Sequence, residues 1–149
     1  MPLTKAEQRL RRRARARAVQ AAYAWDVARG GTLAGTTGRL WDDLALGAAE
    51  RAFATPLIRM LEAHGARIDG ELEALTANWR FERLGAVERA VLRVAAAELL
   101  WVGSEAREPT PPLAVIQEAV RLAERFASPE SARFVNGVLD ALARRLGRL

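Results

Sequence analysis

The segment RRRARARAVQAAYAWD, residues 11–26, carries two patterns along one predicted helix. Six of the nine positions from Arg9 to Arg17 are arginine, whereas the following turns are rich in alanine. At about 100° per residue, small and apolar residues fall within a stripe about 80° wide: Leu10, Ala14, Ala18, Ala21 and Trp25. We expect this stripe to be buried, because small side chains allow another helix to approach closely.

The opposite face of this helix is predicted to be exposed and basic. It gathers Arg9, Arg12, Arg13, Gln20 and Tyr23. Arg12 and Tyr23 are eleven residues apart, which is about three turns, so the two side chains lie nearly one above the other. A ring aligned with arginines offers a base-stacking surface beside phosphate-binding cations, as single-stranded nucleic acid requires.

The positive charge of the chain is concentrated at the start of this helix. Residues 1–17 carry a net charge of +6, whereas the whole chain of 149 residues carries +5. A solvated basic face and a membrane-surface helix are the alternatives to a nucleic-acid site. A membrane-surface helix needs large apolar residues opposite its charges, but here that stripe is mostly alanine. The local charge therefore favours a polyanionic partner, although Tyr23 does not distinguish RNA from DNA.

Composition excludes several classes of function. There is no cysteine and one histidine, His64, so disulfides, thiol nucleophiles and multi-histidine metal sites are excluded. The glycines form no phosphate-binding loop, and we expect neither catalytic activity nor a cofactor. The longest apolar runs are far short of the roughly 20 residues of a membrane span, and no signal peptide is evident. We expect a cytoplasmic protein that does not contact a membrane.

Helical periodicity extends through nearly the whole chain, and no stretch alternates as a strand would. Caps and breakers predict an all-α fold of about seven helices, roughly over residues 5–29, 39–52, 56–65, 67–78, 86–102, 112–126 and 129–145. Thr4, Thr55 and Ser128 are the predicted N-caps, and prolines 56 and 129 follow the last two. Residues 30–38 and 104–112 are predicted loops.

Two residues do not fit their surroundings. Glu98 falls within the apolar stripe of helix 86–102, which contains Val87, Val91, Val94, Trp101 and Val102. A carboxylate there needs a partner, and both an internal arginine and a protein interface can provide one. Gly137 lies inside the last helix at a cost of about 1 kcal/mol relative to alanine, which indicates either close helix packing or backbone exposure toward RNA. The four tryptophans, at positions 25, 41, 79 and 101, are predicted core or interface anchors.

Three segments together resemble the NusB family of transcription antitermination factors. RRRARARAVQAAYAW (11–25) is similar to the amino-terminal signature of that family, and LGAVERAVLRVAAAEL (84–99) to its central helix. VIQEAVRLAERFASPESARFVNGVLDALA (115–143) is similar to the carboxy-terminal signature, with FVNGVLD (134–140) as its most specific part. The segments occur in the family's order, whereas residues 30–52 match poorly.

The resemblance implies one all-helical domain over residues 1–149, made of two small packed bundles at about 1–80 and 81–149. It implies binding to boxA-type single-stranded leader RNA, including that of ribosomal RNA operons. The implied protein partners are NusE, a small-subunit ribosomal protein, and the RNA polymerase antitermination complex. The family suppresses premature termination and has no catalytic activity.

The resemblance also implies particular site residues. The RNA-contacting positions of the family fall on Arg11, Arg12, Arg13, Arg15 and Tyr23, with Arg133, Phe134 and Asn136 at the edge. Its NusE-binding surface includes helix 86–102, which favours Glu98 as a partner-binding residue. Gln117 stands where the family usually has asparagine, and its longer side chain can also donate and accept hydrogen bonds.

Two rival functions remain open from the sequence. Some ribosomal RNA cytosine methyltransferases carry a NusB-like domain, so the chain could be an RNA-targeting module that acts with such an enzyme in trans. A helical DNA-binding regulator is the other rival. It needs a recognition helix behind a tight turn, and helix 5–29 is not placed that way.

Overall fold

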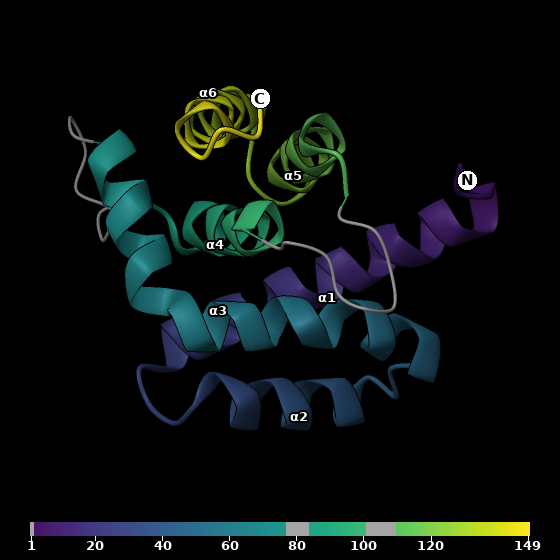
Figure 1. The fold of residues 1–149 in the computed structure, drawn as a ribbon. Helices are drawn as coiled ribbons and strands as arrows, with labels where there is room; N and C mark the ends of the chain where they lie inside the picture. Colours follow the sequence, from purple (N-terminus) through teal and green to yellow (C-terminus); the bar gives the residue numbers. More distant parts are fainter. Residues whose placement is uncertain (1, 77–83, 101–109) are drawn as a thin grey trace.

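The computed structural model describes residues 2–76, 84–100 and 110–149, and these residues form helices and short connections (Figure 1). The described part of the chain contains six helices and no strand, which confirms the predicted all-helical fold. The helices are α1 (Lys5–Ala28), α2 (Leu33–Asp43), α3 (Ala48–Leu75), α4 (Ala86–Leu100), α5 (Pro112–Phe126) and α6 (Pro129–Arg145).

Helix α4 lies at the centre of the arrangement. It packs against α1 and α3 on one side and against α5 and α6 on the other, while α2 covers α1 and α3 (Figure 1). Every residue from Ala90 to Leu99 is buried, including Arg93 and Glu98. Because α4 contacts helices of both halves, the division into two bundles near residue 80 stays a prediction.

The predicted caps at the two ends of the chain are confirmed. The Thr4 hydroxyl accepts a hydrogen bond from the Glu7 amide at 3.1 Å, and the Ser128 hydroxyl accepts one from the Ser131 amide at 3.0 Å. Helix α1 ends where Arg29 takes a left-handed conformation with φ 53°. Each cap satisfies an amide that the first turn of a helix leaves without a partner.

The apolar stripe of α1 is buried along its middle and half-buried at its ends. Ala14, Ala18 and Ala21 have no exposed surface, whereas Leu10 and Trp25 are half-buried and pack against the core. The Trp25 ring lies 5.6 Å from the guanidinium carbon of Arg93. The alanines therefore provide the close helix contact that the periodicity predicts.

The predicted loop over residues 30–38 is wrong, because α2 begins at Leu33. The Thr32 hydroxyl accepts a hydrogen bond from the Gly35 amide at 3.0 Å and caps the helix despite the glycines nearby. Leu33, Thr37 and Trp41 are buried at helical spacing. Burial of this face outweighs the low helix propensity of the segment.

The predicted helix start at Pro56 is wrong, whereas the predicted break near Gly65 is found one residue earlier, at His64. Helix α3 runs through Pro56, and the predicted stop at Gly65 is instead a kink at His64, where φ is −121° and ψ is 22°. Phe53, Leu57 and Leu61 are buried on either side of the proline. This packing carries the helix through Pro56, where the proline alone predicts a new start.

Some predictions fall outside the described residues. Trp79, Trp101, Val102 and the loop residues 104–109 are among them. The helices that the structure describes include none with the length and hydropathy of a membrane span.

Candidate nucleic-acid interface

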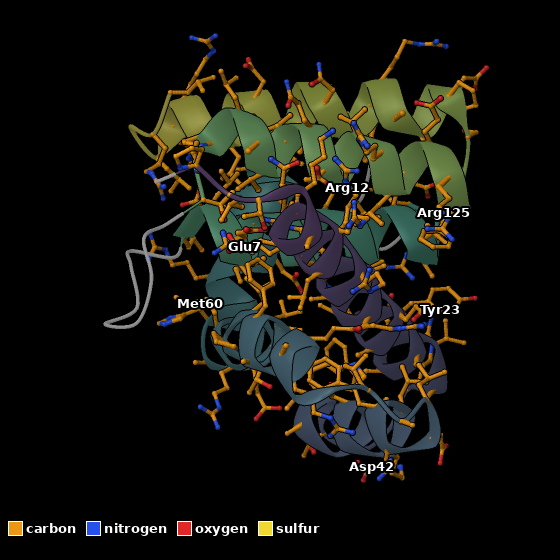
Figure 2. All side chains as sticks on the ribbon, turned by 90° about the vertical axis from the view of Figure 1, so that its right-hand side faces the viewer. Glu7, Arg12, Tyr23, Asp42, Met60 and Arg125 are labelled. Atoms are coloured by element: carbon orange, nitrogen blue, oxygen red, sulfur yellow. The ribbon has the colours of Figure 1, made fainter. Side chains whose placement is uncertain are left out.

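Arg12 and Tyr23 both belong to α1 and lie on the side of the molecule that faces the viewer in Figure 2. Arg13 and Tyr23 are exposed, and Arg11, Arg12 and Gln20 are half-buried. The Tyr23 side chain is among the exposed large hydrophobic groups, at 41%. We call Arg12, Arg13, Gln20 and Tyr23, which are exposed or half-buried along α1, the exposed strip.

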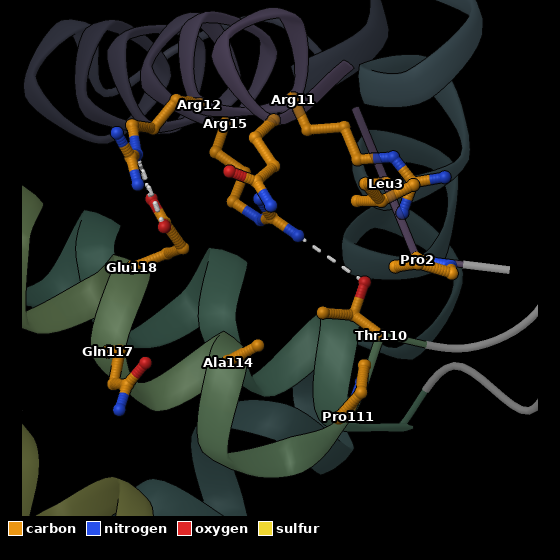
Figure 3. A pocket seen from close by; sticks show the side chains of 11 residues that line it. Pro2, Leu3, Arg11, Arg12, Arg15, Thr110, Pro111, Ala114, Gln117 and Glu118 are labelled. Carbon is orange, nitrogen blue, oxygen red and sulfur yellow. Dashed lines mark hydrogen bonds and ion pairs between the residues drawn. The ribbon is translucent and has the colours of Figure 1, made fainter. Parts of the chain in front are cut away.

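Arg12 links α1 to α5. Its Nε donates to both carboxylate oxygens of Glu118, at 3.2 Å and 3.1 Å (Figure 3). The Arg12 side chain is 41% exposed and that of Glu118 is 17% exposed. The terminal nitrogens of Arg12 make no hydrogen bond among the described residues, so they can bind another acceptor.

Two other strip residues have partners at the surface. The Nε of Arg13 lies 3.4 Å from a carboxylate oxygen of Glu50, with the Arg13 side chain 55% exposed. The Gln20 side-chain oxygen accepts a hydrogen bond from Arg17 at 2.9 Å. An exposed ion pair such as Arg13–Glu50 contributes at most about 1 kcal/mol to stability, so a phosphate can replace the Glu50 carboxylate at little cost.

A groove of about 570 Å³ lies between α1 and α5 beside this strip. Four arginines, two glutamates and two apolar residues line it: Arg12, Arg13, Ala16, Glu118, Arg121, Leu122, Glu124 and Arg125. We call it the α1–α5 groove. The sequence reasoning missed Arg121 and Arg125, because their spacing shows that they share a helix face but not which helix that face meets.

Arg15 lies inside the protein and not on the exposed strip. Its Nε and one terminal nitrogen donate to the two carboxylate oxygens of Glu98, at 2.8 Å and 2.7 Å. The Arg15 side chain is 8% exposed and that of Glu98 is 3% exposed. The same terminal nitrogen lies 3.3 Å from the Thr110 hydroxyl (Figure 3).

This burial bears on two sequence expectations. Arg15 and Glu98 are paired with each other inside the protein, and their roles in binding RNA and a protein partner stay predictions. The carboxylate in the apolar stripe of α4 has the internal arginine that the sequence left open as one alternative. The reason is physical, since a charge within a packed helix face is stabilised only by a partner that is buried with it.

Arg11 reaches a second cavity, of about 600 Å³, between the start of α1 and the start of α5 (Figure 3). Gln117, Thr110 and Pro111 line the same cavity. The Arg11 guanidinium lies 5.1 Å from the centre of the Phe53 ring. Burial, together with the neighbouring charge of Arg15, lowers the pKa of the Arg11 side chain below its ordinary value.

The predicted edge residues belong to α6. Arg133 and Asn136 are exposed, and Phe134 is half-buried against the core. Within the described residues, no hydrogen bond or ion pair joins these three to α1. Gly137 is exposed with open space where a Cβ would lie, so its predicted role in close helix packing is wrong.

Two neighbouring residues at the start of α4 make separate contacts, one with α6 and one with α1. The Ser131 hydroxyl donates to Glu88 at 2.8 Å, and the next residue of α4, Arg89, donates to Asp26 at 2.8 Å. Arg93 of α4 also pairs with Asp69 at 3.0 Å. Burial disfavours the charge of Arg93, but the carboxylates of Asp69 and Asp26 outweigh it and raise the pKa of the guanidinium.

The described part of the chain holds no cluster of side chains suited to a metal ion. Its fold and its exposed arginines define an all-helical protein with one basic strip beside a basic groove. Residues 12–144 match the model of the NusB family. The chain belongs to the NusB family.

Individual relatives agree with this assignment. The transcription antitermination protein NusB of Anaeromyxobacter dehalogenans (strain 2CP-1) is 40% identical over 136 residues, which cover 89% of each protein. The NusB protein of Koribacter versatilis is 43% identical over 96 residues, which cover 64% of this chain and 62% of that protein. The crystal structure of antitermination factors NusB and NusE in complex with dsRNA contains a chain with 29% identity and a TM-score of 0.79, covering 92% of this chain and 98% of that one.

Proposed function

We propose that this protein is a transcription antitermination factor that binds boxA-type leader RNA together with NusE. The observation that carries the proposal is the exposed strip from Arg12 to Tyr23, which lies beside a groove lined by four arginines. Relatives named transcription antitermination protein NusB, and a similar chain in a NusB–NusE–dsRNA complex, support the same function.

The strip suits single-stranded RNA for two physical reasons. Arginine side chains neutralise backbone phosphates and release their counterions, which gives affinity that does not depend on sequence. The Tyr23 ring offers a face on which a splayed base stacks, and stacking contributes about 1–3 kcal/mol per base. Arg11, Arg12, Arg13 and Gln20 are the proposed polar contacts, while Arg15 positions α1 against α4.

The remaining proposed contacts depend on the RNA path. Arg133 and Asn136 are exposed on α6 and Phe134 is half-buried there, so RNA that extends beyond the strip can meet them at its edge. The proposed role is one of binding and assembly with NusE and RNA polymerase, in the cytoplasm and without a catalytic step. None of the proposed contacts requires a proton to move.

A binding titration tests this function. Labelled boxA-type RNA is titrated with the protein alone and with equimolar NusE, and the same sequence is tested as duplex DNA. We expect RNA to bind more tightly than duplex DNA and NusE to increase the affinity. Equal affinity for RNA and duplex DNA, or no effect of NusE, would overturn the proposal.

A further inference from the structure

The second wall of the α1–α5 groove carries two arginines of α5 that form no ion pair within the described residues. Arg121 and Arg125 are exposed on α5, and neither makes a hydrogen bond or ion pair within the described residues. The Arg125 guanidinium lies 5.0 Å from the centre of the Phe126 ring, a contact that restricts where its charge lies. Two cations are thus present on the side of the groove that faces Arg12 and Arg13.

The carboxylate of Glu118 is the anion that binds Arg12 in the free protein. Glu118 belongs to α5, lines the groove and accepts both hydrogen bonds from the Nε of Arg12. The Glu118 side chain is 17% exposed and that of Arg12 is 41% exposed, so the pair lies at the edge of the groove where solvent reaches the arginine. An anion held by Arg12 marks where a phosphate oxygen can lie, because carboxylate and phosphate oxygens accept the same hydrogen bonds.

Glu118 also limits the affinity of this position. It neutralises Arg12 in the free protein, and a second carboxylate, Glu124, lines the same groove. An incoming phosphate meets four arginines and two glutamates, and it must compete with Glu118 for Arg12. A groove with cations on both walls and one resident anion fits a chain of phosphates better than an acidic peptide, since peptide carboxylates are spaced irregularly and carry less charge.

We propose that the α1–α5 groove is the channel for the RNA backbone, with Arg121 and Arg125 as its second wall and Glu118 as a resident anion that the RNA phosphate displaces. This inference rests on the proposed function and extends it to residues of α5. It predicts that two kinds of substitution in this groove change the RNA affinity in opposite directions. Removing the cations of α5 weakens RNA binding, whereas removing the charge of Glu118 strengthens it.

The test uses the full chain, labelled boxA-type RNA and a series of salt concentrations. The double variant Arg121→Ala/Arg125→Ala is compared with the matched control Arg39→Ala/Arg59→Ala. Arg39 and Arg59 are exposed on α2 and α3, outside the groove. At about 0.1 M salt, loss of two phosphate contacts weakens binding roughly 10- to 30-fold and flattens the salt slope by about one to one and a half units. The control leaves the affinity within about twofold of the parent and the salt slope nearly unchanged.

The second arm measures Glu118→Gln with the same RNA. We expect binding to tighten about three- to tenfold at low salt. The guanidinium of Arg12 loses its charged partner, while glutamine keeps the volume of the Glu118 side chain. A misfolded variant cannot produce tighter binding, so this arm is independent of stability. Circular dichroism of each variant checks that the helical content is unchanged.

The outcomes separate this inference from the proposed function. If Arg121→Ala/Arg125→Ala binds RNA like its control while Arg12→Ala/Arg13→Ala loses affinity, the function stands and the second wall is refuted. If the α5 variant loses NusE and keeps RNA, the groove is a protein site and the inference is wrong. Weaker RNA binding by Glu118→Gln contradicts the resident-anion role. If the parent protein binds no RNA, with or without NusE, both proposals fail.

Discussion

Arg12 and Arg15 lie three residues apart on α1, and each pairs with a carboxylate of another helix, but the two pairs have opposite environments. Arg15 and Glu98 are 8% and 3% exposed and meet through two short hydrogen bonds at the α1–α4 contact. Arg12 and Glu118 are 41% and 17% exposed, and both line the α1–α5 groove. The first pair cannot exchange its partner without unfolding the contact, whereas the second can.

The comparison shows that residue type does not assign a role to an arginine on this helix. Burial makes the Arg15–Glu98 pair part of the core, where removal of one partner leaves an isolated charge. Exposure makes the Arg12–Glu118 pair weak and replaceable. The resemblance to a family places both arginines in the same RNA-contacting set, and the structure separates them.

The largest expected effect is on the buried pair. Glu98→Gln leaves the Arg15 charge without its carboxylate, so the free energy of unfolding should fall by about 3–5 kcal/mol. Denaturant unfolding measures it, with Glu118→Gln as the control. Where the variant is folded, its affinity for boxA-type RNA should be unchanged. If the free energy of unfolding fell by less than about 1 kcal/mol while RNA binding weakened, Arg15 would contact RNA and the structural role of the pair would be refuted.

A smaller effect is expected at the far end of the strip. Tyr23→Ala should cost roughly 1–3 kcal/mol of RNA binding and leave the salt slope nearly unchanged, because a stacked ring carries no charge. Tyr23→Phe keeps the ring and serves as the matched variant. A flatter salt slope for Tyr23→Ala, or equal losses in both variants, would show that stacking is not the role of this residue.

The smallest effect is on the stability of the exposed pair. Arg12→Ala and Glu118→Ala should each lower the free energy of unfolding by no more than about 1 kcal/mol. Thermal unfolding of both variants beside the parent measures this. Losses as large as that of Glu98→Gln would mean that the groove pair is structural and would remove the contrast between the two sites.

Local pattern predicted much of the fold. The all-helical class, the caps at Thr4 and Ser128 and the buried alanines of α1 depend on neighbouring residues, so periodicity and capping rules suffice for them. The start of α2 at Leu33 and the passage of α3 through Pro56 depend on tertiary burial, and there the local breaker signals gave the wrong boundaries.

The candidate site could be predicted only on its α1 side. The strip from Arg12 to Tyr23 follows from helical spacing, since all of its residues belong to one helix. The partner of Glu98 and the contribution of Arg121 and Arg125 depend on which helices pack together. Spacing within one helix carries no information about that packing.

The salt dependence of RNA affinity for the parent and for Arg12→Ala/Arg13→Ala tests the central claim most directly. If the exposed face of α1 neutralises roughly three to five phosphates, log affinity should fall with log salt at a slope of about −2 to −4. The variant should flatten this slope by about one to one and a half units, since two phosphate contacts are lost. An unchanged slope and affinity in the variant would contradict the account, because the arginines of α1 would then be a solvated basic face with no role in RNA binding.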